Sequence, residues 1–256
     1  MNKTPVIGVT CHVDTGHQDD IFPGRSLNYI DRTYPDILIR NGMLPFLIPV
    51  NENDDFIVEV LHVIDGLLCT GGGKIPDYIL NRKEIPVLAD TAPDRYRSES
   101  KLFSKALELD LPILGICRGM QMINEVMGGT MYLKISENVS GAMEHNQTKF
   151  GKSLEEAYHE IKIEEDSHLA RVLGVTMLSV NSWHSQSIKE IGRSLKVVAR
   201  SHDQVIEALE SEVNTFVLLT QFHPEIVVKR DLVWNKLFEE FKFQAVEKRK
   251  KRGVLK

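Results

Sequence analysis

The sequence predicts an α/β fold in which helices cover both faces of a parallel sheet. Short apolar runs alternate with helical patterns along the first half of the chain. Within each run the apolar residues are continuous rather than alternating, which is typical of strands buried on both faces of a parallel sheet. No linker or repeat interrupts the 256 residues, so we expect residues 1–256 to form a single domain.

The first half predicts strands and helices in alternation. Strands are expected at 5–10, 44–49, 65–70 and 111–116. Helices are expected at 28–41, 54–63, 98–109 and 118–127. Right-handed crossovers through these helices would make the strands parallel neighbours in one sheet.

The second half is richer in strands, which we expect to be mixed or antiparallel. Residues 134–158 are polar and irregular, and they predict a long loop that covers the functional site of the protein. Strands are then expected within 159–165, 175–182, 195–201, 205–211 and 215–220. A helix capped by Asp166 is expected at 166–174, and the last helix at 231–248. The basic tail after it is predicted to be a solvated chain end.

Composition excludes several function classes. The net charge of −5 gives no indication of nucleic-acid binding. The three cysteines form neither a CxxC pair nor a Cys/His cluster with zinc spacing, so we expect no disulfide framework, metal or cofactor. The apolar run at the N-terminus is too short for a signal peptide, and no window is long enough for a membrane span. A cytoplasmic protein without a membrane or nucleic-acid partner is the expectation.

Residues 115–119, Gly-Ile-Cys-Arg-Gly, place a cysteine between two glycines where a strand passes into a helix. This G-x-C-x-G pattern is the cysteine version of the nucleophile elbow, in which the tight turn requires glycine on either side. The helix N-terminus favours the thiolate, and the N–H of Arg118 is placed to donate to an oxyanion. The motif alone leaves open whether Cys117 is a nucleophile or a buried structural cysteine. We expect Cys11 and Cys69 to be structural.

Two further motifs close buried strands. Residues 221–225, Gln-Phe-His-Pro-Glu, offer His223 as a base and Glu225 as the carboxylate that orients it. The glycines that follow Thr70 allow backbone N–H groups to approach a ligand closely, and we interpret them as half of an oxyanion hole. Because parallel strands end at the same edge of a sheet, the three motifs are expected to meet there, which favours Cys117 as the nucleophile.

These motifs resemble those of a known enzyme superfamily. GICRGMQ, QFHPE, LLCTGGG and the segment NSWHSQ at 181–186 occur in the order seen in class I glutamine amidotransferase-like hydrolases. More specifically, the chain resembles the gamma-glutamyl-gamma-aminobutyrate hydrolase group, and the likeness extends from Tyr34 to LKVVARSHDQVIEAL near the end. The resemblance implies a three-layer α/β/α sandwich with a mainly parallel central sheet, the flavodoxin-like fold of class I glutamine amidotransferases.

The resemblance also implies residue roles and a substrate class. Cys117 would be the nucleophile, His223 the general base and acid, and Glu225 the orienting carboxylate. The oxyanion donors and the residues that hold the glutamyl group would be Gly72, Gly73, Arg118, Gln121, Ser182, Trp183 and His184. The implied reaction cleaves the amide of a small gamma-glutamyl amine through a glutamyl thioester. The segments 11–25 and 74–97 look individual and leave the identity of the leaving amine open.

Alternatives remain at this point. The chain can be a glutaminase subunit that supplies ammonia to a separate synthetase, a non-catalytic binding protein on the same scaffold, or a peptidase or esterase with the same elbow. A homodimer is also left open. Arg95, Arg97 and Glu99 are expected to form surface ion pairs, with binding of a substrate carboxylate as the alternative. His145 and His159 are expected to be solvated.

Overall fold

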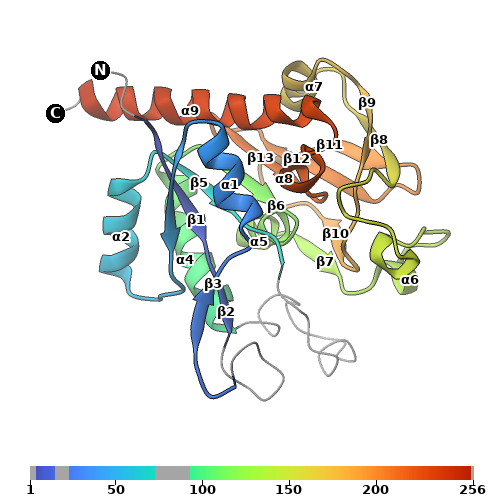
Figure 1. Ribbon diagram of the computed structural model, residues 1–256, viewed down its shortest axis with the longest axis horizontal. Helices are drawn as coiled ribbons and strands as arrows, with labels where there is room; N and C mark the ends of the chain where they lie inside the picture. Colours follow the sequence, from blue (N-terminus) through green and yellow to red (C-terminus); the bar gives the residue numbers. More distant parts are fainter. Residues whose placement is uncertain (1–3, 15–22, 73–92, 255–256) are drawn as a thin grey trace.

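The computed structural model describes residues 4–14, 23–72 and 93–254, which form an α/β structure around one large sheet (Figure 1). Its nine strands have the order β4-β1-β5-β6-β13-β12-β11-β8-β9. In chain order they are β1 Val6–Thr10, β4 Leu44–Ile48, β5 Gly66–Cys69, β6 Ile113–Ile116, β8 His159–Ile163, β9 Met177–Val180, β11 Leu195–Ser201, β12 Ile206–Ser211 and β13 Val217–Thr220. Two small sheets pair β2 (His12–Asp14) with β3 (Leu27–Tyr29), and β7 (Thr130–Tyr132) with β10 (Ser187–Glu190).

Strand direction divides the large sheet into two parts. From β4 to β13 every neighbouring pair is parallel. Beyond β13 the pairs are antiparallel, so β12 and β8 run against the other strands. The expectation of a mainly parallel sheet followed by a mixed, strand-rich second half is therefore confirmed.

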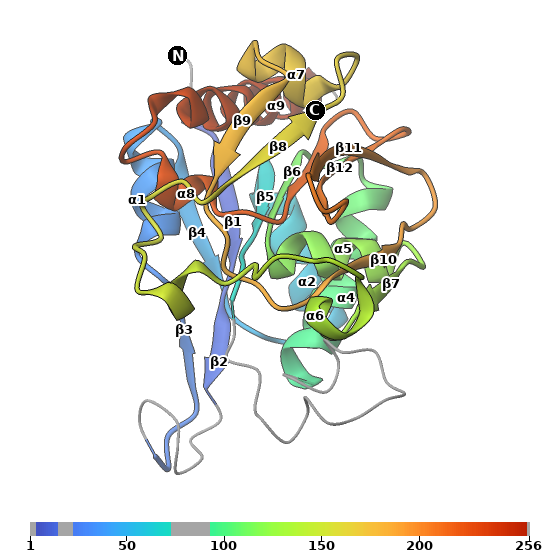
Figure 2. The same ribbon diagram turned by 90° about the vertical axis from the view of Figure 1, so that its right-hand side faces the viewer.

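Helices cover both faces of the sheet (Figure 2). One face carries α1 Thr33–Arg40, α7 His168–Leu173, α8 Pro224–Val227 and α9 Asn235–Val254, and the other carries α2 Asp54–Val63, α4 Pro93–Glu108 and α5 Arg118–Val126. Neighbouring strand residues point to opposite layers: Leu68 packs with the first group of helices and Leu67 with the second. This burial on both faces explains the continuous apolar runs in the sequence.

Strand register brings the three motifs to one edge of the sheet. Cys69 pairs with Gly115, and Thr220 pairs with Ile116, so β5, β6 and β13 end side by side. The backbone N–H of Cys117 donates to Thr220 O at 2.7 Å. The segments that follow these strands therefore begin next to one another.

Some element boundaries were predicted wrongly. The first helix begins at Thr33 rather than 28, because residues 27–29 pair with β2 as β3. The cap of α7 is Ser167 rather than Asp166, since Ser167 Oγ accepts from Ala170 N at 2.9 Å. The irregular segment 134–158 contains two short helical turns, α6 (Ile135–Asn138) and η1 (Gln147–Phe150).

The starts of two further helices also differ from the predicted bounds. Helix α4 starts at Pro93, and the last helix starts at Asn235 after a short 3-10 turn, η2 (Leu232–Trp234). Within the described ranges, none of the helices has the length and apolar character that crossing a membrane requires.

Candidate active site

Cys117 occupies a strained turn between β6 and α5. Its φ of 51° and ψ of −104° lie in a region that residues other than glycine rarely adopt. Close packing holds the turn: a Cβ on Gly119 would collide with the carbonyl of Cys69, and one on Gly115 would lie 2.7 Å from Leu219 Cδ2. The sulfur therefore stands at the N-terminus of α5, where the helix dipole favours a negative charge.

His223 and Glu225 form a buried pair just beyond β13. His223 Nδ1 lies 2.7 Å from Glu225 Oε1, and both side chains are almost completely buried. Burial lowers the pKa of His223, but Glu225 and Cys117 outweigh it and hold this pKa well above its ordinary value. The nitrogen on Glu225's side carries a proton, which leaves Nε2 for the thiol side of the ring.

Asn181 fixes the backbone of His223. Its Oδ1 accepts from His223 N at 2.9 Å, and its Nδ2 donates to His223 O at 3.1 Å. This two-sided contact sets the direction in which the imidazole leaves the chain. Asn181 lies in the NSWHSQ segment, but the sequence did not indicate its link to the histidine.

Two glutamine side chains form a chain of hydrogen bonds that ends at the sulfur of Cys117. Gln121 Nε2 donates to Gln221 Oε1 at 3.0 Å, and Gln221 Nε2 in turn donates to the sulfur at 3.6 Å. Both amides are buried. The expectation that Gln121 holds substrate stays a prediction, and its amide also positions Gln221. Gln221 belongs to the QFHPE motif but had no predicted role.

The segment after β5 is held from two sides. Gly71 N donates to the hydroxyl of Tyr34 at 2.9 Å. On the other side Arg95 donates to Gly72 O at 2.8 Å and to Thr70 O at 3.1 Å. Gly71 lies at the centre of the site, because a Cβ there would be 3.0 Å from His223 Cε1 and 3.2 Å from Cys117 Cβ. Gly73 lies outside the described residues.

The expectation that Arg95 and Glu99 form a surface ion pair is wrong. Their side chains are almost completely buried, with Arg95 Nε 2.6 Å from Glu99 Oε1. The pair lies inside because the guanidinium satisfies the carbonyls that follow β5. Arg118 Nε lies 3.6 Å from Glu99 Oε2, and burial lowers the pKa of Arg118 to about 10. Arg97 alone of the three predicted surface residues is exposed, where it pairs with Glu52 and Asp94.

A cavity of about 660 Å³ opens onto Cys117 and His223. Its wall includes His12, Tyr29, Tyr34, Gly71, Gly72, Arg118, Gln121, Asn146, Trp183, His184 and Glu225. Trp183 is 46% exposed, and its ring centroid lies 5.8 Å from that of His223. In contrast to Trp183, Ser182 is fully buried, and its hydroxyl donates to His145 O at 2.8 Å.

We call Cys117, His223, Glu225, Gly71 and Gly72 the strand-end site. The sequence did not predict the contacts that His12, Tyr34 and Arg95 make around this site. Burial and Arg95 lower the pKa of His12 to about 2, so this ring is neutral and its Nδ1, 3.0 Å from Arg95 Nη1, accepts a hydrogen bond. Tyr34 and Arg95 lie in stretches that carry the family resemblance, which was the available signal.

A second polar group, the histidine cluster, consists of His145, His159, His184, Asp203 and Glu207. The expectation that His145 and His159 are solvated is wrong, since they are 1% and 6% exposed. His145 Nε2 lies 3.0 Å from Asp203 Oδ2, and His159 Nε2 lies 3.5 Å from Glu207 Oε1. Glu207 on β12 and Asp203 in the turn before it provide carboxylate partners, and these allow the imidazoles to be buried in the protein.

Comparison with known proteins identifies the family of the chain. Residues 5–225 match the model of the peptidase C26 family. The chain is 31% identical to the putative glutamine amidotransferase-like protein YvdE of Lactococcus lactis, over 84% of this chain and 88% of that protein. It is 29% identical to gamma-glutamyl-gamma-aminobutyrate hydrolase PuuD of Escherichia coli, over 94% and 93% of the two chains.

Solved structures support the fold. A putative GMP synthase subunit of Thermoplasma acidophilum superposes with a TM-score of 0.65 at 19% identity and covers 98% of both chains. At this identity the likeness concerns the architecture. The match over residues 5–225 shows that the chain belongs to the peptidase C26 family, as a hydrolase of glutamine amidotransferase type.

Proposed function

We propose that the protein hydrolyses the amide bond of a small gamma-glutamyl amine, releasing glutamate and the free amine. The observation that carries this proposal is the meeting of Cys117, the His223–Glu225 pair and the segment after β5 at one cavity. The relative named gamma-glutamyl-gamma-aminobutyrate hydrolase supports the substrate class. The leaving amine would contact the part of the wall formed by His12, Tyr29 and Asp31.

The first half of the reaction forms a thioester. The thiolate of Cys117 attacks the gamma carbonyl carbon, and the carbonyl electrons move to the oxygen. His223 then gives its Nε2 proton to the amine nitrogen as the carbon–nitrogen bond breaks. The raised pKa of His223 keeps this proton available at neutral pH.

The second half returns the enzyme to its starting state. His223, now neutral, takes a proton from water while the water oxygen attacks the thioester carbon. Collapse of this intermediate expels the thiolate and leaves glutamate, and His223 holds the proton taken from water. Glu225 stabilises the imidazolium and holds the ring in one tautomer throughout, without itself taking the proton.

Backbone N–H groups would stabilise the oxyanion. Arg95 Nη1 lies 3.4 Å from Gly71 O. In a trans peptide the carbonyl oxygen and the next N–H point in opposite directions, so the N–H of Gly72 points away from Arg95. Gly72 lines the cavity, which makes this N–H and that of Arg118 the donors we propose.

The second candidate is a glutaminase that delivers ammonia to a partner, which relatives named as glutamine amidotransferases favour. Purified protein is incubated with glutamine and with a panel of gamma-glutamyl amines that includes gamma-glutamyl-aminobutyrate and gamma-glutamyl polyamines. Released glutamate is the measurement. Our proposal expects turnover of at least one gamma-glutamyl amine well above that of glutamine. Turnover restricted to glutamine would favour the glutaminase, and no turnover of any compound would contradict the hydrolase.

A further inference from the structure

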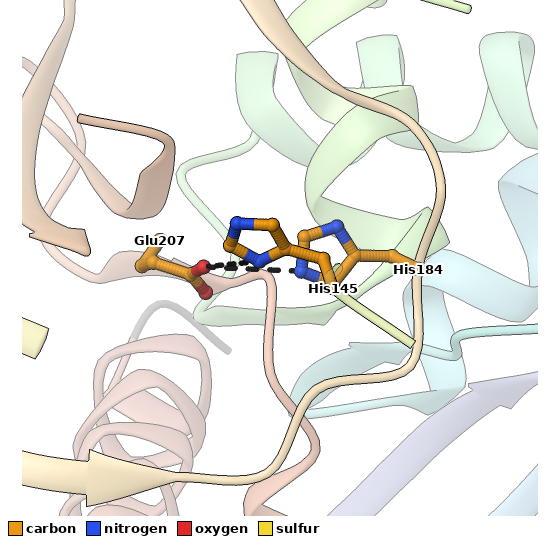
Figure 3. A group of neighbouring side chains, drawn as sticks. All are labelled: His145, His184 and Glu207. Atoms are coloured by element: carbon orange, nitrogen blue, oxygen red, sulfur yellow. Dashed lines mark ion pairs between the residues drawn. The ribbon is translucent and has the colours of Figure 1, made fainter. Parts of the chain in front are cut away.

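The histidine cluster contains three side chains with the geometry of metal ligands. His145 precedes η1, His184 follows β9, and Glu207 lies on β12. His145 Nδ1 lies 3.4 Å and His184 Nε2 3.8 Å from Glu207 Oε1, and the three ligand atoms lie within 4.8 Å of one another. Figure 3 shows both rings turned toward the carboxylate. Around a tetrahedral zinc ion, ligand atoms with bonds of about 2.1 Å are about 3.4 Å apart.

The outer nitrogen of each ring is already engaged. His184 Nδ1 lies 2.9 Å from the carbonyl oxygen of Gln186, which only accepts, so Nδ1 carries the proton. His145 Nε2 lies 3.0 Å from Asp203 Oδ2, and Asp203 Oδ2 also accepts from Met143 N at 2.9 Å. A carboxylate or carbonyl behind each imidazole is the arrangement that orients histidine ligands in metal sites.

The inner atoms of His184 and Glu207 do not satisfy one another. In the neutral His184 ring Nε2 presents a lone pair, and it faces a carboxylate oxygen that also accepts. Within the described part of the chain, His184 Nε2, Glu207 Oε1 and Glu207 Oε2 have no hydrogen-bond partner. The side chain of His184 is 1% exposed and that of Glu207 is 0% exposed. Buried acceptors that face each other are costly unless a cation lies between them.

We propose that His145, His184 and Glu207 bind a zinc ion. The ligands are His145 Nδ1, His184 Nε2 and the carboxylate of Glu207, whose second oxygen can complete four coordination. Imidazole and carboxylate ligands suit zinc, and the carboxyl groups of Asp203 and Glu207 provide two acidic groups beside a divalent cation. His159 approaches the carboxylate but lies outside the group of three, so it supports the site without joining it.

The ion would have a structural role next to the cavity. His184 lines that cavity, and the neighbouring Trp183 pairs with Asn146, the residue after His145, in an isolated β-bridge. The metal would fasten these two wall segments to β12. This inference does not depend on the proposed reaction.

Zinc binding is measured on the full-length protein after removal of bound metal with a chelator. Zinc alone is titrated in competition with a chromophoric chelator, in the wild type and in Cys117→Ala, which removes the reactive thiol as a ligand. We expect about one tightly bound zinc per chain in both, with imidazole nitrogens at about 2.0–2.1 Å in the X-ray absorption spectrum. Glu207→Gln and His184→Gln should bind at least about 100-fold more weakly, because loss of even an outer partner costs 10–100-fold.

The matched control is His168→Gln, which alters another histidine–carboxylate pair, His168 and Glu240, at the surface. It should bind zinc like the wild type. Failure of wild type and Cys117→Ala to bind zinc would overturn the proposal. So would zinc that is lost only in Cys117→Ala, or that is retained equally in Glu207→Gln and His184→Gln. If those two variants do not fold, the wild-type titration and its absorption spectrum decide.

Discussion

The strand-end site and the histidine cluster are both buried groups of histidines and carboxylates, but they are assembled differently. His223 and Glu225 are two residues apart and pair at 2.7 Å, and their strand ends beside a cysteine with a φ of 51°. In the histidine cluster, His145 and Asp203 are 58 residues apart, and none of its five members has a positive φ, although Gln204 beside Asp203 has a φ of 69°. Strain beside an open cavity marks a site built for reaction, whereas buried contacts between distant segments mark one built for holding the chain together.

Replacing the nucleophile should separate activity from stability most sharply. Cys117→Ala should lower kcat/KM for gamma-glutamyl-p-nitroanilide by at least about 10⁴-fold, since the residues of a triad act as a unit. The thermal midpoint should not fall. Cys11→Ala, which alters another buried cysteine, should retain activity, and unchanged activity in Cys117→Ala would refute the triad.

Removing the charge of Glu225 should test the pair at the strand end. Glu225→Gln should lower kcat by about 10³- to 10⁴-fold, because the ring loses its fixed tautomer. Glu225 raises the pKa of His223 against the lowering effect of burial. Without the charge of Glu225 this pKa should fall, and His223 should lose its acid proton at a lower pH. The basic limb of kcat/KM against pH should therefore move to lower pH. Glu155→Gln, in a surface pair with Lys229, should leave the limb in place.

The same substitution in the histidine cluster should act on stability instead. Glu207→Gln should reduce the free energy of unfolding by about 3–5 kcal/mol, because its buried partners keep their polarity. Denaturant unfolding measures this loss. The rate at which iodoacetamide alkylates Cys117 should stay the same. If Glu207→Gln instead kept its free energy of unfolding and its Cys117 reacted more slowly, the histidine cluster would serve reactivity rather than stability.

A single methyl group should affect the strand-end site more mildly. Gly71→Ala places a Cβ 2.8 Å from the Tyr34 hydroxyl and 3.0 Å from His223 Cε1. The displacement should cost about 10²-fold in kcat, the effect expected of a 1 Å misplacement. Gly253→Ala meets no atom within 4 Å and is the control. Equal kcat values for the two variants would mean that the spacing around Gly71 does not matter.

The sequence predicted the strand-end site because each of its motifs follows a buried apolar strand. Gly115, Cys117 and Gly119, and likewise His223 and Glu225, are close in the chain, so local geometry was enough to suggest their chemistry. Their roles and the single domain stay predictions, and the identity of the leaving amine stays open. The fold was accessible for the same reason, since burial on both faces leaves a continuous apolar pattern.

What the sequence could not predict depends on contacts between distant segments. The carbonyls that hold Arg95 inside come from residues 70–72, and the carboxylates beside His145 come from the turn and strand around 203–207. A charged or histidine side chain is expected at the surface unless such partners are known. The start of α1 was misplaced because residues 27–29 find a partner in β2.

The sulfur of Cys117 is the atom that should carry the glutamyl group during turnover, and this is the central claim. The protein is mixed with a gamma-glutamyl substrate that it turns over, quenched in acid within the first turnover, and analysed by intact mass and peptide mapping. We predict an added mass of one glutamyl group on the peptide that contains Cys117, and its absence in Cys117→Ala. Turnover of the substrate with an adduct on another residue, or with the adduct retained in Cys117→Ala, would contradict this claim.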